Sequence, residues 1–418
     1  MSWKTIRLIA ALVSICGLAL GSAAANAQTN YLTDLGAVAP ALGINNSGEV
    51  VLQNYIYSHG TLTAFPDGFT GNAINASGEV AGSMPAPPAD PYFQVVAAVY
   101  SNGTVTAIPA TSFFADPLNP VGACYFGTGI NDSGSVVGWY DIYCTTIYSS
   151  QPPGGWVYSG STVTSIGGGC DGGSVAQAIN DSGQITGWSS FCPNGQQDAF
   201  LYGNSPSGND KIAALGTGGA GFAINASGQV AGGQSLGATS TGGFLYSNGH
   251  VTLLPGRAGI GYAINASGLI VGDDVNGQPH AYLYNGATTV DLNTLVSSTD
   301  PLKPYVTLAD ARGINDSGLV VVNGVDSRDN SNHAYLLQVP SIKIAPSKSG
   351  GGAFDSLSLM FLVGILALRC ILCGKTAFTK PALALKVGSG HVSQTPRSRF
   401  SKSATSDALN QPSRNVTA

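Results

Sequence analysis

Apolar and small residues alternate in short runs through the central part of the chain, as in residues 261–264, Gly-Tyr-Ala-Ile. A period of two predicts β-strands. Each run leads into Ile-Asn-x-Ser-Gly, in which Asn can bond the backbone two residues on and Gly accepts a positive φ. This pattern predicts a hairpin with a short turn. The asparagines of the seven copies are Asn45, Asn75, Asn131, Asn180, Asn225, Asn265 and Asn315.

The copies recur at intervals of 30, 56, 49, 45, 40 and 50 residues. A second hairpin follows each copy, as in residues 99–108 and 244–253, where Asn-Gly separates two alternating runs. Each unit therefore holds four short strands, and four strands in ~40–45 residues are typical of a propeller blade. We predict an all-β fold, a seven-bladed β-propeller of four-stranded blades.

Two small positions accompany every hairpin. The residue two before the Asn is always Gly or Ala, so one face of the first strand must meet a close neighbour. These residues are Gly43, Ala73, Gly129, Ala178, Ala223, Ala263 and Gly313. The second strand usually ends in Gly, except in the first and last copies, where Leu52 and Val322 stand. Terminal repeats are often atypical.

The two ends of the repeat region complement each other. Residues 31–35 form a lone strand that resembles the fourth strand of a unit, whereas the last unit stops after residues 333–337 and Pro340. In a closed ring the N-terminal strand would complete the last blade and leave few exposed edges. We therefore assign the propeller to residues 28–340 and expect a monomer.

The N-terminal residues 1–27 have the pattern of a signal peptide. Lys4 and Arg7 precede an apolar run, and Ala25-Asn26-Ala27 is a small-x-small cleavage site. The alternative, a membrane anchor, is disfavoured because 13 apolar residues are too few to span a bilayer. We predict an exported protein at the cell surface or outside the cell.

Three segments follow the repeats. Residues 341–352 form a Gly-rich linker, residues 353–373 a hydrophobic segment, and residues 374–418 a basic tail. The hydrophobic segment predicts a transmembrane helix of marginal length, and a basic tail beyond it suits the cytoplasmic side. The tail has little apolar periodicity, which predicts disorder. Membrane contact through the C-terminus is therefore expected.

Charge and cysteine content narrow the function classes. Residues 28–352 contain 7 Lys and Arg against 20 Asp and Glu, which argues against nucleic acid because nucleic-acid binding needs a basic face. An even number of cysteines in an exported chain predicts disulfides, and the pairs Cys124–Cys144 and Cys170–Cys192 each flank one repeat turn. The metal alternative lacks Cys-x-x-Cys spacing and nearby His.

The repeated set also resembles a known family. Residues 130–138, Ile-Asn-Asp-Ser-Gly-Ser-Val-Val-Gly, and residues 280–284, His-Ala-Tyr-Leu-Tyr, are similar to the bacterial extracellular HAF-repeat family, over roughly residues 30–340. This resemblance implies an exported, repeat-built β protein and no particular activity. Separately, residues 350–369 resemble a GlyGly-type C-terminal sorting signal, which implies cleavage near Gly350 to Gly352. The alternative is a retained membrane anchor.

Candidate chemistry is sparse. Glu49 and Glu79 follow turn glycines, and Asp132, Asp181 and Asp316 occupy the turns, where capping is the expected role. His280 and His333 open strands at equivalent places, which indicates a structural role. Asp273 and Asp274, with Asn276, offer oxygen ligands for Ca²⁺, with a solvated loop as the alternative. We predict no cofactor.

These observations favour one function class over two others. We expect a cell-surface binding or structural module that is not an enzyme, with an unknown glycan or protein as its partner. A polysaccharide-acting propeller enzyme and an envelope-assembly partner are the alternatives. Acidic residues gathered at one end of the ring would favour the enzyme.

Overall fold

The computed structural model describes residues 30–66, 68–88, 93–109, 123–141, 144, 152–167, 173–191, 196–203, 213–237, 240–256, 258–274 and 280–340. All of them belong to the first of two compact units, which ends at Pro346. Their regular secondary structure is β-strand, apart from the single-turn helix α2 (Leu292–Leu295), and turns and loops connect these elements. The predicted all-β class is confirmed.

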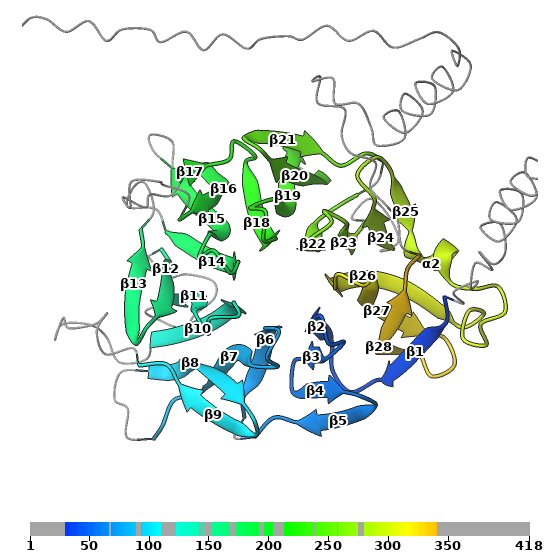
Figure 1. The fold of residues 1–418 in the computed structure, drawn as a ribbon, viewed down its shortest axis with the longest axis horizontal. Coiled ribbons are helices and arrows are strands. Elements are labelled where there is room, and N and C mark those ends of the chain that lie inside the picture. The colour runs from blue at the N-terminus through cyan, green and yellow to red at the C-terminus, as the bar shows by residue number, and fades with distance from the viewer. Residues whose placement is uncertain are drawn as a thin grey trace, which may run out of the picture. The chain divides into compact units, whose positions relative to one another are not determined.

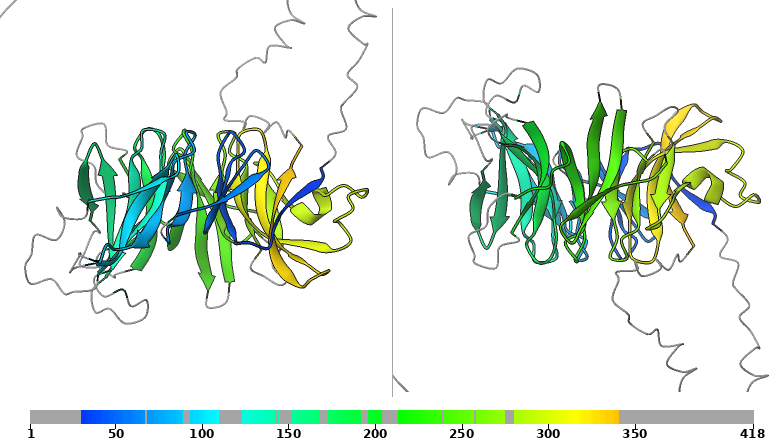
Figure 2. Two further views of the ribbon diagram at one scale, coloured as in Figure 1. Left: turned by 90° about the horizontal axis from the view of Figure 1, so that it is seen from below. Right: turned by 90° about the horizontal axis from the view of Figure 1, so that it is seen from above.

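Antiparallel groups of four strands follow one another along the chain and around a common centre (Figures 1 and 2). The first groups are β2 (Ala41–Ile44), β3 (Val50–Leu52), β4 (Tyr55–Ser58) and β5 (Thr61–Ala64); β6 (Thr70–Ile74), β7 (Val80–Pro85), β8 (Phe93–Ser101) and β9 (Thr104–Ala107); and β10 (Ala123–Ile130), β11 (Val136–Asp141), β12 (Gly154–Ser159) and β13 (Thr162–Ile166). The second and third groups form one eight-stranded sheet, because β8 and β10 pair in parallel where Ala123 faces Phe93.

The next groups repeat the arrangement. They are β14 (Ser174–Ile179), β15 (Ile185–Phe191), β16 (Gln196–Tyr202) and β17 (Ala213–Ala214); β18 (Gly219–Ile224), β19 (Val230–Gly237), β20 (Ser240–Ser247) and β21 (His250–Leu253); and β22 (Gly261–Ile264), β23 (Ile270–Asp273), β24 (Ala281–Tyr284) and β25 (Thr289–Asp291). In every group the first strand lies innermost (Figure 1). The repeat motif therefore surrounds the centre.

The last sheet joins the two ends of the repeat region. It contains β26 (Val306–Ile314), β27 (Leu319–Asp326) and β28 (Ser331–Gln338), with β1 (Leu32–Gly36) at its outer edge. β1 runs antiparallel to β28, with Leu32 opposite Leu337 and Asp34 opposite Tyr335. The N-terminal strand thus supplies the fourth strand that the last unit lacks, and this pairing agrees with the sequence analysis.

The small residue before the turn faces the next repeat at Gly129 and at Gly313. A Cβ added to Gly129 would lie 3.0 Å from the carbonyl oxygen of Gln177 and 3.1 Å from Cα of Ala178. A Cβ added to Gly313 would lie 2.9 Å from the Ile44 side chain, which belongs to the first repeat. Innermost strands of consecutive repeats therefore pack backbone to backbone, which accounts for the restriction to Gly and Ala.

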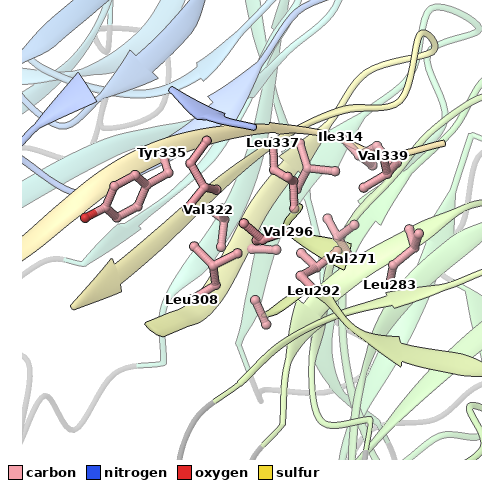
Figure 3. Close-up of a cluster of buried hydrophobic side chains, with 14 of the residues drawn as sticks. Val271, Leu283, Leu292, Val296, Leu308, Ile314, Val322, Tyr335, Leu337 and Val339 are labelled. Atoms are coloured by element: carbon pink, nitrogen blue, oxygen red, sulfur yellow. The ribbon is translucent and has the colours of Figure 1, made fainter. Parts of the chain in front are cut away.

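The hydrophobic core lies between neighbouring sheets. Its largest cluster joins the β22–β25 sheet to the last sheet (Figure 3) and includes Val271, Leu283, Leu292, Val322 and Leu337, all fully buried. Fully burying one such side chain stabilises a fold by roughly 1.5–3 kcal/mol. Helix α2 contributes Leu292 to this cluster. Face-to-face burial between sheets is thus the main force that holds them around the centre.

One of the two predicted disulfides lies within the described residues. The predicted disulfide Cys124–Cys144 is confirmed, with the two Cα atoms 5.1 Å apart. Cys170 and Cys192 lie outside the described residues, as do the predicted signal peptide, linker, hydrophobic segment and basic tail. Within the described part of the chain, no helix has the length and apolar character needed to cross a membrane.

Candidate functional site

The repeated asparagines connect neighbouring repeats as well as shaping their own turns. At Asn225, the side-chain oxygen accepts hydrogen bonds from the backbone N–H groups of Ser227 and Gln229, at 3.1 and 3.0 Å. Its Nδ2 donates to the backbone oxygen of Asn265 in the next repeat, at 3.1 Å. The turn chemistry was foreseeable, whereas the bond to the next repeat was not.

These inter-repeat bonds form a closed cycle, which we call the Asn ring. They run from Asn45 to Asn75, from Asn75 to Asn131, from Asn131 to Asn180, from Asn180 to Asn225, from Asn225 to Asn265, from Asn265 to Asn315, and from Asn315 back to Asn45. All seven side chains are buried. Because each amide both donates and accepts, only an amide of this length serves the position.

In four of the repeats, the residue after the turn glycine supports the Asn ring. Glu49 and Glu79 accept a hydrogen bond from Nδ2 of the Asn in their own repeat, at 2.8 and 2.9 Å. Gln184 and Gln229 do the same in theirs, each at 2.8 Å. Both glutamates therefore act as acceptors within the turn.

The turn aspartates cap turns, as expected, and each of them caps the turn of the preceding repeat. The carboxylate of Asp132 accepts from the backbone N–H of Ala76 at 2.8 Å, and that of Asp181 from Asp132 at 2.9 Å. Asp316 likewise accepts from Ala266 at 2.8 Å. Each carboxylate thus caps the preceding repeat, because its side chain points around the ring. All three line a cavity of about 240 Å³ beside the Asn ring.

A second ring lies three residues before the Asn ring on the same strands. The pairing register of every innermost strand shifts there by one residue, which is a β-bulge. The skipped residues, which we call the bulge ring, are Leu42, Asn72, Thr128, Gln177, Phe222, Tyr262 and Arg312. Sequence reasoning missed this ring, because its residues share no chemical type.

The glycine that ends most second strands was the available signal for the bulge. A Cβ added to Gly138 would lie only 1.8 Å from the carbonyl oxygen of Phe126, just before the bulge at Thr128. Gly187 meets the carbonyl oxygen of Val175 in the same way, at 1.9 Å. The close approach of the two backbones therefore excludes a side chain at this position.

All seven bulge-ring side chains line one cavity of about 560 Å³, a volume within the usual range for small-molecule sites. The isoleucines of the repeat motif line this cavity and also the smaller one beside the Asn ring. They are Ile44, Ile74, Ile130, Ile179, Ile224, Ile264 and Ile314. The isoleucines therefore form an apolar layer between the larger cavity, which we call the wide cavity, and the smaller polar cavity beside the Asn ring.

One side of the wide cavity carries aromatic rings and a cation. The rings of Phe222 and Tyr262 meet edge to face, with centroids 5.7 Å apart. The Arg312 guanidinium carbon lies 3.8 Å from the centre of the Tyr262 ring, within range of a cation–π interaction. Nε of Arg312 donates to Oδ2 of Asp310 at 2.7 Å.

Asp273 lies behind these residues. Its Oδ2 accepts from the Tyr262 hydroxyl at 3.4 Å. Burial raises the pKa of Asp273 and the negative charge of Asp310 raises it further, while Arg312 opposes the shift. Burial and the charge of Asp273 raise the pKa of Tyr262 to about 12. One oxygen each of Asp273 and Asp310 is buried without a hydrogen-bond partner among the described residues.

The opposite wall combines an aromatic pair with polar side chains. Phe126 and Trp139 stack with centroids 4.6 Å apart, and both line the cavity. Asn72 donates to the backbone oxygen of Gly127 at 2.7 Å, and Thr128 to that of Ala176 at 2.7 Å. These two side chains are therefore held in place by the following repeat.

Charged groups also gather where β1 joins β28. His333 bonds Asp34 through Nδ1 at 2.9 Å and Asp329 through Nε2 at 3.0 Å. Arg328 pairs with the buried Asp326 and reaches Asp34 at 3.7 Å. Atoms of Asp34, Asp326 and His333 that can bind metals lie within 4.8 Å of one another, but Arg328 and His333 already pair with these carboxylates.

The other candidate residues from the sequence do not line the wide cavity. His280 pairs with Asp291 at 3.1 Å. Asp273 and Asp274, named above for Ca²⁺, are adjacent in the chain, and Asn276 lies outside the described residues. The absence of a cofactor stays a prediction.

Comparisons with known proteins add similarity of fold. No protein-family model and no curated protein matches the chain. Among solved structures, it is similar to the β-propeller domain of the Trilobed protease from Pyrococcus furiosus, with 9% identity, a TM-score of 0.45, and coverage of 78% of this chain and 99% of that one. An acylaminoacyl peptidase from Pyrococcus horikoshii has 11% identity, a TM-score of 0.43, and coverage of 75% and 52%.

A sialidase from Trypanosoma rangeli, solved with sialic acid, has 8% identity, a TM-score of 0.38, and coverage of 84% of this chain and 63% of that one. These peptidases and the sialidase overturn the expectation that the chain is not an enzyme. That expectation failed because it relied on local sequence motifs, whereas a propeller can assemble a site from distant repeats. At such low identity the similarity concerns the fold and assigns no reaction.

Proposed function

We propose that residues 28–340 form a seven-bladed β-propeller closed by the N-terminal strand. The seven hydrogen bonds of the Asn ring support this count, because they return from Asn315 to Asn45. The antiparallel pairing of β1 with β28 supports the closure. A closed ring leaves no long unpaired edge near the ends of the domain.

We further propose that this propeller binds a carbohydrate in the cavity lined by the bulge ring. The observation that carries the proposal is the contrast within each repeat, since the Asn ring is invariant while the bulge ring holds seven different side chains around one cavity. Aromatic faces suit the apolar faces of sugars, and amide and hydroxyl groups suit their hydroxyls. Trp139, Phe222, Asn72 and Gln177 supply both kinds of contact.

A second candidate function is action on a polysaccharide. It is favoured by Asp273, whose pKa is raised by burial beside Tyr262 and Asp310. Asp273 does not line the cavity itself, but it bonds Tyr262, which does, and a carboxyl group with a raised pKa near a cavity is a candidate general acid. The two candidates share one ligand class and differ only in whether the bound saccharide is cleaved.

The test is a glycan array with the full-length protein, followed by titration of each glycan that binds. Phe222→Ala and Trp139→Ala should each weaken binding by about tenfold or more, since each removes an aromatic contact of roughly 1–3 kcal/mol. Leu253→Ala is the matched control, because Leu253 is exposed on β21, and it should bind like the parent. Binding of proteins alone, or glycan binding that both cavity variants retain, would contradict the proposal.

Mass spectrometry of the bound glycans separates the two candidates. Intact saccharide after long incubation supports binding, whereas shortened products that disappear in Asp273→Asn support cleavage.

The localisation of the protein is a separate proposal. We propose export by residues 1–27, with the propeller outside the inner membrane, residues 353–373 in it, and cleavage near Gly350 to Gly352. The apolar run at the start, the marginal length of the second run, and the three glycines before it support this order. The mass of the mature protein checks it, and a C-terminus at Ala418 would leave only a membrane anchor.

A further inference from the structure

Cations are scarce in the described residues. The only Lys and Arg residues in these ranges are Lys303, Arg312 and Arg328. Nζ of Lys303 donates to the backbone oxygens of Asn293 and Val296, and Arg328 pairs with Asp326. Arg312 differs from both, because it is the one charged residue among those that line the wide cavity.

The guanidinium of Arg312 is fixed from behind. Asp310 binds its Nε, and the Tyr262 ring lies against its face. Among the described residues, no hydrogen bond uses its terminal nitrogens, and the side chain keeps 32% of its surface exposed. A guanidinium held through Nε and stacked on a ring presents its two terminal nitrogens as a preorganised fork.

A fork of this kind matches a planar carboxylate. One guanidinium can donate two parallel hydrogen bonds to the two oxygens of a carboxylate. The local charge also matters, because Asp310 already offsets part of the positive charge and would repel a doubly charged group. A singly charged carboxylate therefore suits this site better than a phosphate.

We propose that Arg312 binds the carboxylate of an acidic sugar, so that the cavity selects uronate-containing saccharides over neutral ones. The inference rests on the proposed carbohydrate function and names its ligand class. The uronate carboxylate lies on the terminal nitrogens of Arg312, and the sugar ring lies towards the amide of Gln177 and the ring of Phe222, which belong to the fourth and fifth repeats. No covalent step is involved.

The experiment uses the full-length protein and three pairs of oligosaccharides. Oligomers of galacturonate, mannuronate and glucuronate are each compared, by calorimetric titration, with the neutral oligomer in which every carboxyl group is reduced to an alcohol. At least one acidic oligomer should bind about tenfold more tightly than its neutral partner, since hydrogen bonds to charged groups contribute roughly 1.5–3 kcal/mol. Raising the salt concentration should reduce this preference.

Arg312→Gln should abolish the preference, because a neutral amide cannot form the charged two-bond contact with a carboxylate. Arg312→Lys keeps the charge but loses the fork, so it should give an intermediate preference. Thermal unfolding of each variant checks that the fold is intact.

Equal binding of acidic and neutral oligomers, or a preference that persists in Arg312→Gln, would overturn this inference and leave the carbohydrate proposal standing. Tighter binding of a sulfated oligomer than of the carboxylated one would overturn it as well. Binding of none of the six oligomers would overturn both proposals together.

Discussion

The Asn ring and the bulge ring lie three residues apart on the same seven strands, yet they tolerate different chemistry. Each member of the Asn ring bonds its own turn and the backbone of the next repeat, as Asn225 does with Gln229 and Asn265. Each member of the bulge ring lines a cavity. A side chain that satisfies fixed backbone groups has one suitable length and polarity, whereas a side chain that meets a ligand can vary.

This difference separates the scaffold from the site within one repeat. Variation at the bulge ring changes the side chains that the cavity offers to a ligand. The Asn ring meanwhile keeps the strands in place. Three changes to the chain and one change of pH would break or sharpen this distinction.

Deletion of residues 31–35 should have the largest effect. It removes β1, leaves the edge of β28 unpaired, and exposes buried side chains such as Leu336 and Leu337. We expect loss of cooperative thermal unfolding, or aggregation. Differential scanning calorimetry and light scattering measure both. If the shortened chain unfolds as the parent does, the Asn ring alone closes the domain and the proposed role of β1 is wrong.

Asn225→Ala should destabilise the domain by about 3–4 kcal/mol. It removes four hydrogen bonds and leaves the backbone N–H groups of Ser227 and Gln229 without acceptors, and each unsatisfied group costs about 1–3 kcal/mol. Phe222→Ala, three residues away, should cost less than about 1.5 kcal/mol because its side chain is only half-buried.

Chemical denaturation gives both free energies of unfolding. Ser227→Ala is the control in the same turn, since Ser227 is exposed, and it should change stability by less than about 0.5 kcal/mol. A cost for Phe222→Ala as large as that for Asn225→Ala would remove the distinction between scaffold and site.

Replacing both Cys124 and Cys144 with Ala should cost about 2–3 kcal/mol. The disulfide closes a loop with a sequence separation of 20 residues, and its removal frees the unfolded chain in the chain-entropy model. The expected result is a lower denaturation midpoint with glycan affinity unchanged, because neither cysteine lines the cavity. Weaker glycan binding at temperatures where the variant is folded would show that the Cys124–Cys144 disulfide also shapes the site.

Raising the pH should loosen the β1–β28 junction slightly. Burial alone would lower the pKa of His333, but hydrogen bonds to Asp34 and Asp329 and the charges of both carboxylates raise it overall. Because the folded pKa lies above the unfolded value of about 6.5, this contribution is complete below pH 6.5 or so and is lost as the pH rises through the folded pKa.

Thermal unfolding at a series of pH values above 6 checks this, with His333→Gln as the variant that should lose the dependence. A His333→Gln variant with the same slope as the parent would place the titrating group elsewhere.

At the acidic end, hydrogen bonds from Arg328 lower the pKa of Asp326 to about 2. That contribution to stability is present above pH 4 or so, the unfolded range of Asp, and is lost as the pH falls towards 2.

Much of the scaffold was predictable because its signals are local. The Asn-x-Ser-Gly turns, the four strands in each unit and the pairing of residues 31–35 with the last unit follow from turn chemistry, periodicity and the matched chain ends. The Cys124–Cys144 pair followed from its flanking position. The capping role of Asp132 was predictable, whereas its partner, Ala76 of the preceding repeat, was not.

The candidate site was not predictable in the same way. A β-bulge depends on the pairing of two strands, so the only sequence signal for Thr128 and Tyr262 is indirect and lies in the glycines of the paired strands, Gly138 and Gly272. The expectation of a chain without enzymatic activity failed for a related reason, because it treated the absence of a local motif as the absence of a site.

The sequence by itself therefore determined the turns, the strands and the number of repeat motifs, since these depend on residues a few positions apart. Only the tertiary structure decided which carbonyl each Asn binds, which side chains face the cavity, and that Arg312, Tyr262 and Asp273 meet. Tyr262 and Arg312 are separated by 50 residues in the chain. They become neighbours because the innermost strands of consecutive repeats, β22 and β26, contact each other around the centre.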